Sequence, residues 1–587
     1  MQYRKYSFYI LFVAVSFSWN FLNAQPYPQN YFRCPLDIPI SLAGNFGELR
    51  ANHFHTGLDI KTAGKEGLLV HAAADGYVSR IAVSSVGYGN ALYITHPNGY
   101  TTVYGHLSAY NAAIQNFLRQ TQYKSESFEQ DIKPEKDQFP VSKGDVVAYS
   151  GNSGSSGGPH LHFEIRETKT EKPVNPLLFG FNVPDIIPPV IQAIKIYPLD
   201  TNSYVKVVYD QNGKSSLKSL TANYGQNVKV FAYKKGEYYY LKNVTLLQAE
   251  GNIGFSVEAN DYKDHDYNKI GVYSIELCVN EEEIYHKSMN VLDFDLKRYI
   301  NTHVDYAERM KTGSWFEKCY VSPNNELPIY DSLKNRGIVP MKSGNIYHIS
   351  FYLNDYNNNF STLAFDVSSP QVKPEIPPIE KGYDSILSYD KPHNINLGNI
   401  YINVPKNIFY DNVEFKYQDL PGKKHGYSDI YSLGNAAIPC QDYFDVGIKA
   451  DNLPARLQSK ACIVSYAYGY LGGEYDNGWV RAKTRTLGKF LINVDTIPPT
   501  LVPVNIKNGK NMAGTNQIRF LVKDNMSGVK NYRGTIDGHW VLFQHDAKRS
   551  LIYYTFDEHC PPGSHKLVLT AADDRNNTRT VEMEFRN

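Results

Sequence analysis

The sequence contains few cysteines, and no two of them lie close together in the chain. Six cysteines occur in 587 residues, at positions 34, 278, 319, 440, 462 and 560. Because they form no C-x-x-C pair, the sequence predicts neither a cysteine-ligated metal site nor a dense disulfide framework. One pairing, Cys440 with Cys462, stays open if the protein is exported to an oxidising compartment.

An excess of charge of either sign is also missing. The chain has 60 lysines and arginines against 59 aspartates and glutamates, a net charge of +1. This balance gives no electrostatic reason to expect nucleic acid or a strongly anionic partner. We therefore expect no nucleic-acid binding.

Long apolar runs are absent after the first 25 residues. Arg4 and Lys5 precede an apolar stretch from Tyr9 to Phe17, and Ala24 ends a small-residue site before Gln25. This order is typical of a signal peptide over residues 1–24. The stretch is shorter than the roughly 20 residues of a membrane span, although an uncleaved anchor stays open. We expect an exported protein of the periplasm or cell envelope, or a secreted one, with no integral membrane segment after signal removal.

Histidines gather in three short motifs, and the His-Glu-x-x-His motif, which binds zinc from a helix, does not occur. His160 and His162 lie two apart in a run typical of a strand, so both imidazoles leave the same face. Gly57, between His55 and Asp59, predicts a tight loop that folds both donors inward. His106 follows Gly105 in the third motif. A single histidine among 17 is more often a surface or core residue than a ligand, so the argument depends on the surrounding sequence.

That surrounding sequence predicts a compact antiparallel β-sheet with polar donors at strand ends. Alternating runs and turns predict strands over 77–83, 90–96, 100–106, 146–150 and 160–165, with a hairpin at 98–99 and a glycine/serine loop at 151–158.

The motifs Phe54-His-Thr-Gly-Leu-Asp-Ile60, Tyr104-Gly-His-Leu107 and Gly158-Pro-His-Leu-His-Phe-Glu-Ile165 resemble those of the lysostaphin-type (LytM-like) zinc metallopeptidases, over about residues 40–180. The resemblance implies the duplicated hybrid motif fold, one Zn²⁺ per chain held by His55, Asp59 and His162, and a catalytic pair, His106 and His160, with His160 as the base. It further implies that a zinc-bound water hydrolyses peptide bonds in peptidoglycan stem peptides or cross-links. Peptidoglycan peptides are the expected partner.

Two other functions are compatible with parts of this sequence. A non-catalytic cell-wall binding or regulatory protein would use the same cleft and the β modules, and the complete ligand set argues against it. A sugar-phosphotransfer domain also carries paired histidines, and the expected export argues against it. His53, His71 and His96 are interpreted as structural or rim residues, and Tyr104 as a packed strand aromatic.

A long insertion separates Ser108 from Pro140. Apolar residues within Ala109 to Gln122 predict a short amphipathic helix, followed by a charged loop. The sequence supports two interpretations of this insertion equally: it forms a wall of the substrate cleft, or it is a solvent-exposed segment with no role in the site.

After residue 183 the chain becomes rich in tyrosine, asparagine and valine in alternating runs, which predicts stacked β-sandwich modules. Asp185-Ile-Ile-Pro-Pro189 and Asp495-Thr-Ile-Pro-Pro499 mark the start of modules, and two strand-turn-strand patterns, 349–359 and 567–577, mark their ends. Lys297 to Met310 is a candidate helix and 366–378 a linker. The expected domains are a signal peptide (1–24), a zinc metallopeptidase domain (25–182), an immunoglobulin-like module (183–296), a second β-rich unit or its continuation (297–370), a β-rich domain (379–494) and a C-terminal immunoglobulin-like module (496–587).

Overall fold

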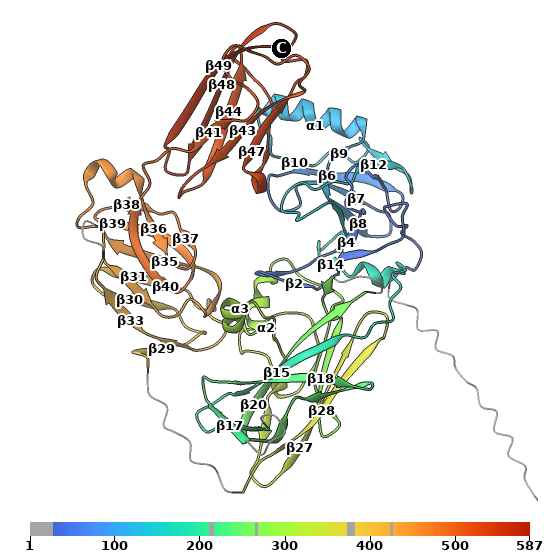
Figure 1. Cartoon of the computed structure of the whole chain (residues 1–587), viewed down its shortest axis with the longest axis vertical. Helices are drawn as coiled ribbons and strands as arrows, with labels where there is room; N and C mark the ends of the chain where they lie inside the picture. The colour runs from blue at the N-terminus through green and yellow to red at the C-terminus, as the bar shows by residue number, and fades with distance from the viewer. Residues whose placement is uncertain (1–26, 211–216, 264–267, 372–381, 423–425) are drawn as a thin grey trace, which may run out of the picture.

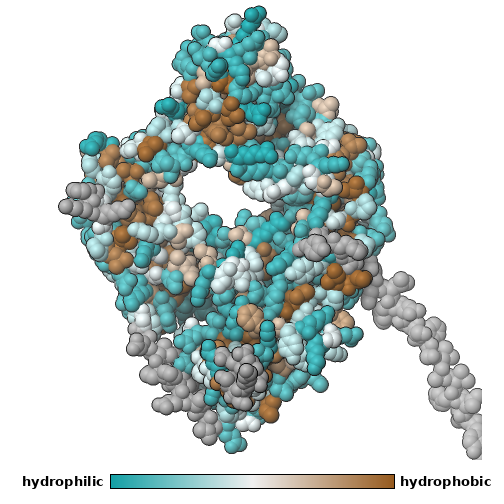
Figure 2. Space-filling view, viewed as in Figure 1, coloured by the Kyte–Doolittle hydropathy of each residue, from teal (hydrophilic) through white to brown (hydrophobic). Residues whose placement is uncertain are grey.

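The computed structural model describes residues 27–210, 217–263, 268–371, 382–422 and 426–587. The expected signal peptide lies outside these residues. Four β-rich units follow one another around a central opening (Figure 1), and the opening passes through the space-filling surface (Figure 2). Among the described residues, no helix has both the length and the apolar character that crossing a bilayer requires.

The first unit is an antiparallel sheet of nine strands beside a smaller sheet of three. Its elements are β1 (Leu42–Gly44), β2 (Leu49–Arg50), β3 (His53–Phe54), β4 (Leu58–Lys61), β5 (Leu69–His71), β6 (Gly76–Val83), β7 (Asn90–Thr95), β8 (Tyr100–Leu107), β9 (Ala109–Tyr110), α1 (Ala112–Ser125), β10 (Gln130–Ile132), β11 (Pro140–Val141), β12 (Val146–Tyr149), β13 (His160–Glu167), β14 (Pro173–Val174) and η1 (Pro176–Phe179). The large sheet has the order β1-β4-β13-β8-β7-β6-β10, with β11 beside β6 and β14 beside β13, and the small one the order β5-β12-β9. The predicted strands are confirmed as β6, β7, β8, β12 and β13.

The second unit continues through residue 368 as one connected set of strands. Its strands are β15 (Val190–Pro198), β16 (Tyr204–Asp210), β17 (Leu217–Asn223), β18 (Val228–Lys235), β19 (Tyr238–Leu241), β20 (Val244–Tyr262), β21 (Lys269–Ile270), β22 (Ser274–Val279), β23 (Glu282–Ser288), β24 (Glu317–Lys318), β25 (Tyr330–Leu333), β26 (Val339–Met341), β27 (Ile346–Asn354) and β28 (Phe360–Ser368). β28 pairs with β19 and β20, so the strands after residue 297 join those before it. The candidate helix at 297–310 forms three short helices: η2 (Lys297–Tyr299), α2 (Ile300–His303) and α3 (Tyr306–Thr312); η3 (Asn335–Gly337) follows.

The third unit packs two five-stranded sheets and one two-stranded sheet around an apolar core, and the fourth packs a four-stranded and a five-stranded sheet around another. The third contains β29 (Ser385–Leu387), β30 (His393–Asn396), β31 (Ile400–Val404), β32 (Val413–Phe415), β33 (Tyr417–Leu420), β34 (Ile430–Leu433), β35 (Pro439–Lys449), η4 (Ala455–Lys460), β36 (Ala461–Ser465), β37 (Gly469–Tyr470), β38 (Glu474–Asp476), β39 (Trp479–Thr486) and β40 (Gly488–Val494). The fourth contains β41 (Thr500–Pro503), β42 (Lys510–Asn511), β43 (Gln517–Lys523), β44 (Val529–Ile536), β45 (His539–Trp540), β46 (Phe543–Asp546), η5 (Ala547–Arg549), β47 (Leu551–Thr555), β48 (Ser564–Asp573) and β49 (Thr578–Arg586). The mostly β fold class is confirmed.

The cysteines stay unpaired. All six lie within the described residues, and all are free thiols. Cys440 is on β35 and Cys462 is on β36, which belong to different sheets of the third unit. The pairing left open by the sequence is therefore absent from this structure.

The two segments that end in a pair of prolines, 185–189 and 495–499, are called hinges here, and both are held by the same hydrogen bonds. The side-chain amide of Asn359 donates to the Asp185 carbonyl (3.0 Å) and to the Asp355 carboxylate (2.7 Å). The amide of Asn577 makes the equivalent bonds to Asp495 (2.9 Å) and Asp573 (2.7 Å). In each module, the start pattern and the end pattern noted in the sequence are thus joined by hydrogen bonds. The asparagine of the closing turn binds the aspartate with which the hinge begins.

The fourth unit returns to the first and closes the ring. Helix α1 lies beside it (Figure 1), and the Tyr123 ring stacks on His559 with centroids 3.8 Å apart. Arg119 pairs with Glu558, and Arg533 pairs with Glu126 at 2.6 Å. The insertion thus forms the predicted helix and serves as a contact between domains.

Candidate metal centre

Two adjacent strands bring the predicted ligands together. Asp59 on β4 stands directly opposite His162 on β13, and His55 lies in the turn just before β4. The sequence placed both His55 and Asp59 in a loop, but cross-strand pairing draws Asp59 into the sheet. A Cβ on Gly57 would lie 2.4 Å from the carbonyl oxygen of Phe163, so only glycine lets this turn lie against β13.

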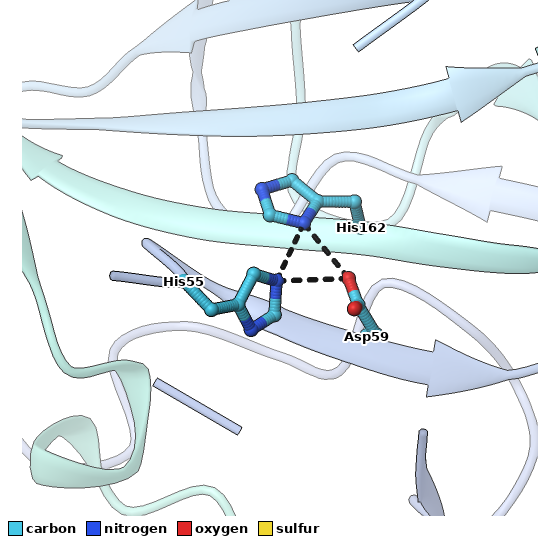
Figure 3. Close-up of side chains that lie close together, drawn as sticks. All are labelled: His55, Asp59 and His162. Carbon is cyan, nitrogen blue, oxygen red and sulfur yellow. Dashed lines mark hydrogen bonds and ion pairs between the residues drawn. The ribbon is translucent and has the colours of Figure 1, made fainter. Parts of the chain in front are cut away.

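The three donor atoms form a nearly equilateral triangle (Figure 3). His55 Nε2 is 3.0 Å from His162 Nδ1 and 3.0 Å from Asp59 Oδ1, and His162 Nδ1 is 2.9 Å from Asp59 Oδ1. All three side chains are buried. Tetrahedral zinc with bonds of about 2.0–2.1 Å separates its ligands by about 3.3 Å, close to this spacing.

The opposite end of each ligand is anchored. His55 Nδ1 donates to the Asn45 carbonyl (2.7 Å), and His162 Nε2 donates to Glu164 Oε1 (2.8 Å). Arg50 donates to the second oxygen of Asp59 (2.6 Å). These bonds turn the other nitrogen of each imidazole, His55 Nε2 and His162 Nδ1, into the triangle, where it can bind a metal once it is unprotonated.

The electrostatics of the triangle favour a cation. Burial alone would lower the pKa of His162, but its bonds to Asp59 and Glu164 raise that pKa to about 9. Without metal, His162 is therefore protonated between the carboxylates of Asp59 and Glu164. A divalent metal can replace this proton, so the donor set fits zinc in both type and charge.

His106 and His160 lie beside the triangle, with ring centroids 4.7 Å apart. His106 Nδ1 donates to the Ser153 carbonyl (2.9 Å), and His160 Nδ1 donates to the Gly158 carbonyl (2.8 Å). His106 has a φ of +59°, a conformation that non-glycine residues rarely adopt and that is concentrated at functional sites. The glycine/serine loop therefore orients both imidazoles from behind.

Their free nitrogens differ in environment. His160 Nε2 is buried without a hydrogen-bond partner in the described part of the chain, and lies 3.3 Å from Asp59 Oδ1. Burial and the neighbouring His162 and His160 lower the pKa of His106 to about 3. A positive charge on His106 is thus disfavoured.

A buried carboxylate that was not predicted from the sequence lies behind His162. Glu164 is fully buried and accepts hydrogen bonds from His162, Thr56 (2.5 Å), Tyr88 (2.6 Å) and Arg166 (2.6 Å). Glu164 and Arg166 continue the two-residue period of His160 and His162 along β13, a signal that could have identified them.

The remaining histidines have other surroundings. His53 is exposed at the rim of the cavity described below. His71 and His96 are buried and bonded to the backbone, at 2.8 Å from the Gly144 and Asp75 carbonyls respectively. Tyr104 is completely buried and its hydroxyl contacts the Ala73 amide, as expected for a packed strand aromatic.

A cavity of about 530 Å³ opens beside the ligands. His55, His106 and His162 line it together with residues of the second and third units, including Phe294 and Arg485. Its lining includes no residue of the insertion 109–140. The interpretation of the insertion as a cleft wall is therefore wrong for this cavity, because α1 packs against the fourth unit instead.

Comparisons with known proteins point to the same region. The model of peptidase family M23 matches residues 53–124 and 130–176, and that of the Zu5-like domain matches residues 384–495. The DD-carboxypeptidase/endopeptidase Mpg of Neisseria meningitidis serogroup B is 35% identical over 132 residues, 22% of this chain and 24% of Mpg. The cell division protein DipM of Caulobacter vibrioides is 26% identical over 141 residues, 23% of this chain and 19% of DipM. The chain thus spans about a quarter or less of these curated relatives.

Among solved structures, the catalytic domain of the prophage-encoded M23 protein EnpA from Enterococcus faecalis is 27% identical, with a TM-score of 0.19. That match covers 26% of this chain and 97% of the EnpA chain. The M23 match contains all three triangle residues and both adjacent histidines. The domain that carries them belongs to the lysostaphin-type (LytM-like) metallopeptidases of family M23.

Proposed function

We propose that this protein is an exported zinc metalloendopeptidase that hydrolyses peptide bonds in peptidoglycan stem peptides or cross-links. The observation that carries the proposal is the buried triangle of His55, Asp59 and His162, with sides of 2.9–3.0 Å and every ligand anchored from behind. The family membership of the domain supports the reaction class. The N-terminal sequence pattern supports export.

In this proposal His55, Asp59 and His162 hold the metal. Zinc, when bound there, supplies a Lewis acid that makes water nucleophilic at neutral pH. The walls of the cavity hold the substrate carbonyl next to His106 and His160. Burial of the ligands keeps bulk water away from the charges that develop during the reaction.

His160 is the better candidate for the general base. Its Nδ1 proton is committed to the Gly158 carbonyl, so Nε2 presents a lone pair that can take a proton from the attacking water. Asp59 Oδ1, 3.3 Å away, stabilises the resulting imidazolium. The same proton can pass to the amine nitrogen as the C–N bond breaks. His106, which stays neutral, orients the water through its own Nε2.

The test is digestion of purified cross-linked peptidoglycan by the chain lacking residues 1–24, with the released muropeptides resolved by mass. We expect conversion of dimers to monomers that stops with a chelator and returns with added zinc. A His160→Ala variant that keeps its zinc is the matched control and should leave the dimers intact. Stoichiometric zinc without cleavage would contradict the proposal and favour a non-catalytic wall-binding protein.

A further inference from the structure

The cavity beside the metal centre is completed by residues from outside the peptidase domain. Leu292, Asp293, Phe294, Lys297 and Arg298 of the second unit line it, and so does Arg485 of the third unit. Three separate units therefore shape the space next to the ligands.

This outer part of the cavity carries positive charge. Lys297, Arg298 and Arg485 contribute three cations, whereas Asp293 is the single acidic residue of the lining, and Lys172 already pairs with it at 3.1 Å. Arg50 also lines the cavity but is committed to Asp59. The cations of the outer part therefore exceed the anions.

The arginines are held in place without being fully neutralised. Arg298 donates to two neutral acceptors, the Gln441 and Cys440 carbonyls, each at 3.1 Å. Arg485 lies over the Tyr443 ring at 3.9 Å and bonds the exposed Asp442 through Nη2 (3.0 Å). Its Nε is buried and has no hydrogen-bond partner among the described residues. Fixed guanidinium groups with spare donors are typical of carboxylate recognition.

We infer that Lys297, Arg298 and Arg485 form a carboxylate-binding subsite, which holds a free carboxylate of the substrate peptide while the scissile bond lies at the metal centre. This inference rests on the proposed peptidase function and adds a substrate class to it. Two carboxylates of a peptidoglycan peptide have the required chemistry: the side-chain carboxylate of its diamino acid and the carboxylate at its C-terminus. Neutral bridges made only of glycine lack an internal carboxylate and would use the subsite poorly.

The experiment compares three synthetic peptides: one with both carboxylates free, one amidated at the diamino acid side chain and one amidated at the C-terminus. Binding of each to the full mature chain is measured by calorimetry, and cleavage by steady-state kinetics. Because a hydrogen bond to a charged group contributes about 1.5–3 kcal/mol, amidation of the recognised carboxylate should raise Kd and KM by about 10- to 150-fold. The peptide that loses affinity identifies the carboxylate.

Variants locate the effect. Lys297→Met and Arg298→Gln should each reduce the difference between free and amidated peptides. The matched control is Lys311→Met, an exposed lysine of α3 outside the cavity lining, and it should preserve the difference. Lys297 is exposed, so its variant tests the subsite even if the Arg298 change disturbs folding.

The outcomes separate the two proposals. Selective binding of free carboxylates without cleavage would support the subsite and contradict the peptidase function. Cleavage with equal affinity for all three peptides would contradict the subsite and support the peptidase function. Failure to bind any of the peptides would overturn the subsite.

Discussion

At the scale of single residues, the candidate site separates ligands from neighbours by what their second nitrogen contacts. His55 Nε2 and His162 Nδ1 point into the triangle, whereas the imidazoles of His106 and His160 are bonded to a loop beside it. This division predicts different losses on mutation.

Asp59→Ala and His162→Ala should lose metal and activity together, because each removes a donor from the triangle. His106→Ala should keep about one zinc per chain and lose activity, because its nitrogens face the loop and the cavity. Metal content by elemental analysis, measured beside muropeptide release, checks both expectations. Zinc loss in all three variants would contradict the division of roles.

Glu164→Gln should weaken zinc binding by about 10- to 100-fold, the usual cost of losing an outer carboxylate that orients a ligand histidine. Zinc competition with a chromogenic chelator measures the affinity. Glu167→Gln, at the exposed end of the same strand, is the matched control and should leave it unchanged. Equal affinities for the two variants would show that Glu164 serves only the fold.

The five central residues were predictable because the short motifs that contain them resemble those of a known metallopeptidase family, and this resemblance implied their roles. Glu164 and Arg166 were within reach, since they continue the alternation of β13. No local sequence pattern could have predicted Asn45, Arg50 and Tyr88, because they contact the site only through the tertiary structure. Arg485 comes from a different unit altogether.

At the scale of elements, the two hinges have the same pattern of hydrogen bonds, but a buried cation lies beside the first. Lys263 Nζ lies 2.7 Å from Asp185 Oδ2, and Asp261 and Asp355 lie close by. Burial raises the pKa of Asp261 to about 8, with Asp355 and Asp185 adding to the rise and Lys263 opposing it. The folded protein therefore keeps a proton that the unfolded chain releases near pH 4.

The stability that this proton provides is fully present below about pH 4 and is lost as pH rises towards 8, by at most about 1.4 kcal/mol per pH unit. Asp261→Asn should remove this dependence and raise the melting temperature at pH 8 relative to the parent protein. Thermal melts from pH 5 to pH 8.5 measure the effect, with the exposed Asp451→Asn as control. Parallel pH profiles for the parent and Asp261→Asn would contradict the assignment.

Element boundaries were predicted well where apolar and polar residues alternate, as in β6, β7, β8 and β13. The insertion shows the limit of this approach. Its helical period correctly gave a helix, but the partner of that helix is set by Tyr123 and Arg119 meeting residues more than 430 positions away. No pattern within the insertion indicates that contact.

At the scale of the whole molecule, ring closure reaches the glycine/serine loop at residues 151–158. Lys548 of the fourth unit donates to the Asn152 carbonyl, to Asn152 Oδ1 (2.9 Å) and to the Ser156 carbonyl (3.1 Å). It thus ties together both sides of the loop whose Ser153 and Gly158 carbonyls orient His106 and His160.

Lys548→Met should lower kcat by about 3- to 10-fold with little change in KM or zinc content, because small displacements of catalytic groups cost rate more than affinity. Faster hydrogen exchange over 151–158 should accompany the loss, and Lys548→Arg should restore part of the rate. The exposed Lys566→Met is the control. An unchanged kcat in Lys548→Met would show that the loop holds its shape without the fourth unit.

The core of the peptidase domain also extends beyond residue 182. Met289, Leu292, Ile300 and Val304 are buried in the same cluster as Phe54 and Leu58. Each such side chain contributes about 1.5–3 kcal/mol when buried. A chain of residues 25–182 should therefore melt at a lower temperature and be less soluble than a chain of residues 25–371. Equal melting temperatures would contradict a shared core.

Asn45 connects this shared core to the candidate metal centre. Its carbonyl accepts the His55 proton, while its side-chain amide exchanges two hydrogen bonds with Gly271 of the second unit, at 2.7 and 2.8 Å. Thermodynamic linkage is reciprocal, so if zinc binds the triangle as proposed, any free energy by which docking of the second unit favours zinc equals the free energy by which zinc favours docking. For the proposed zinc protein, metal loading then becomes a checkpoint on assembly: we expect a chain whose later units have not yet folded to hold zinc less tightly than the finished ring.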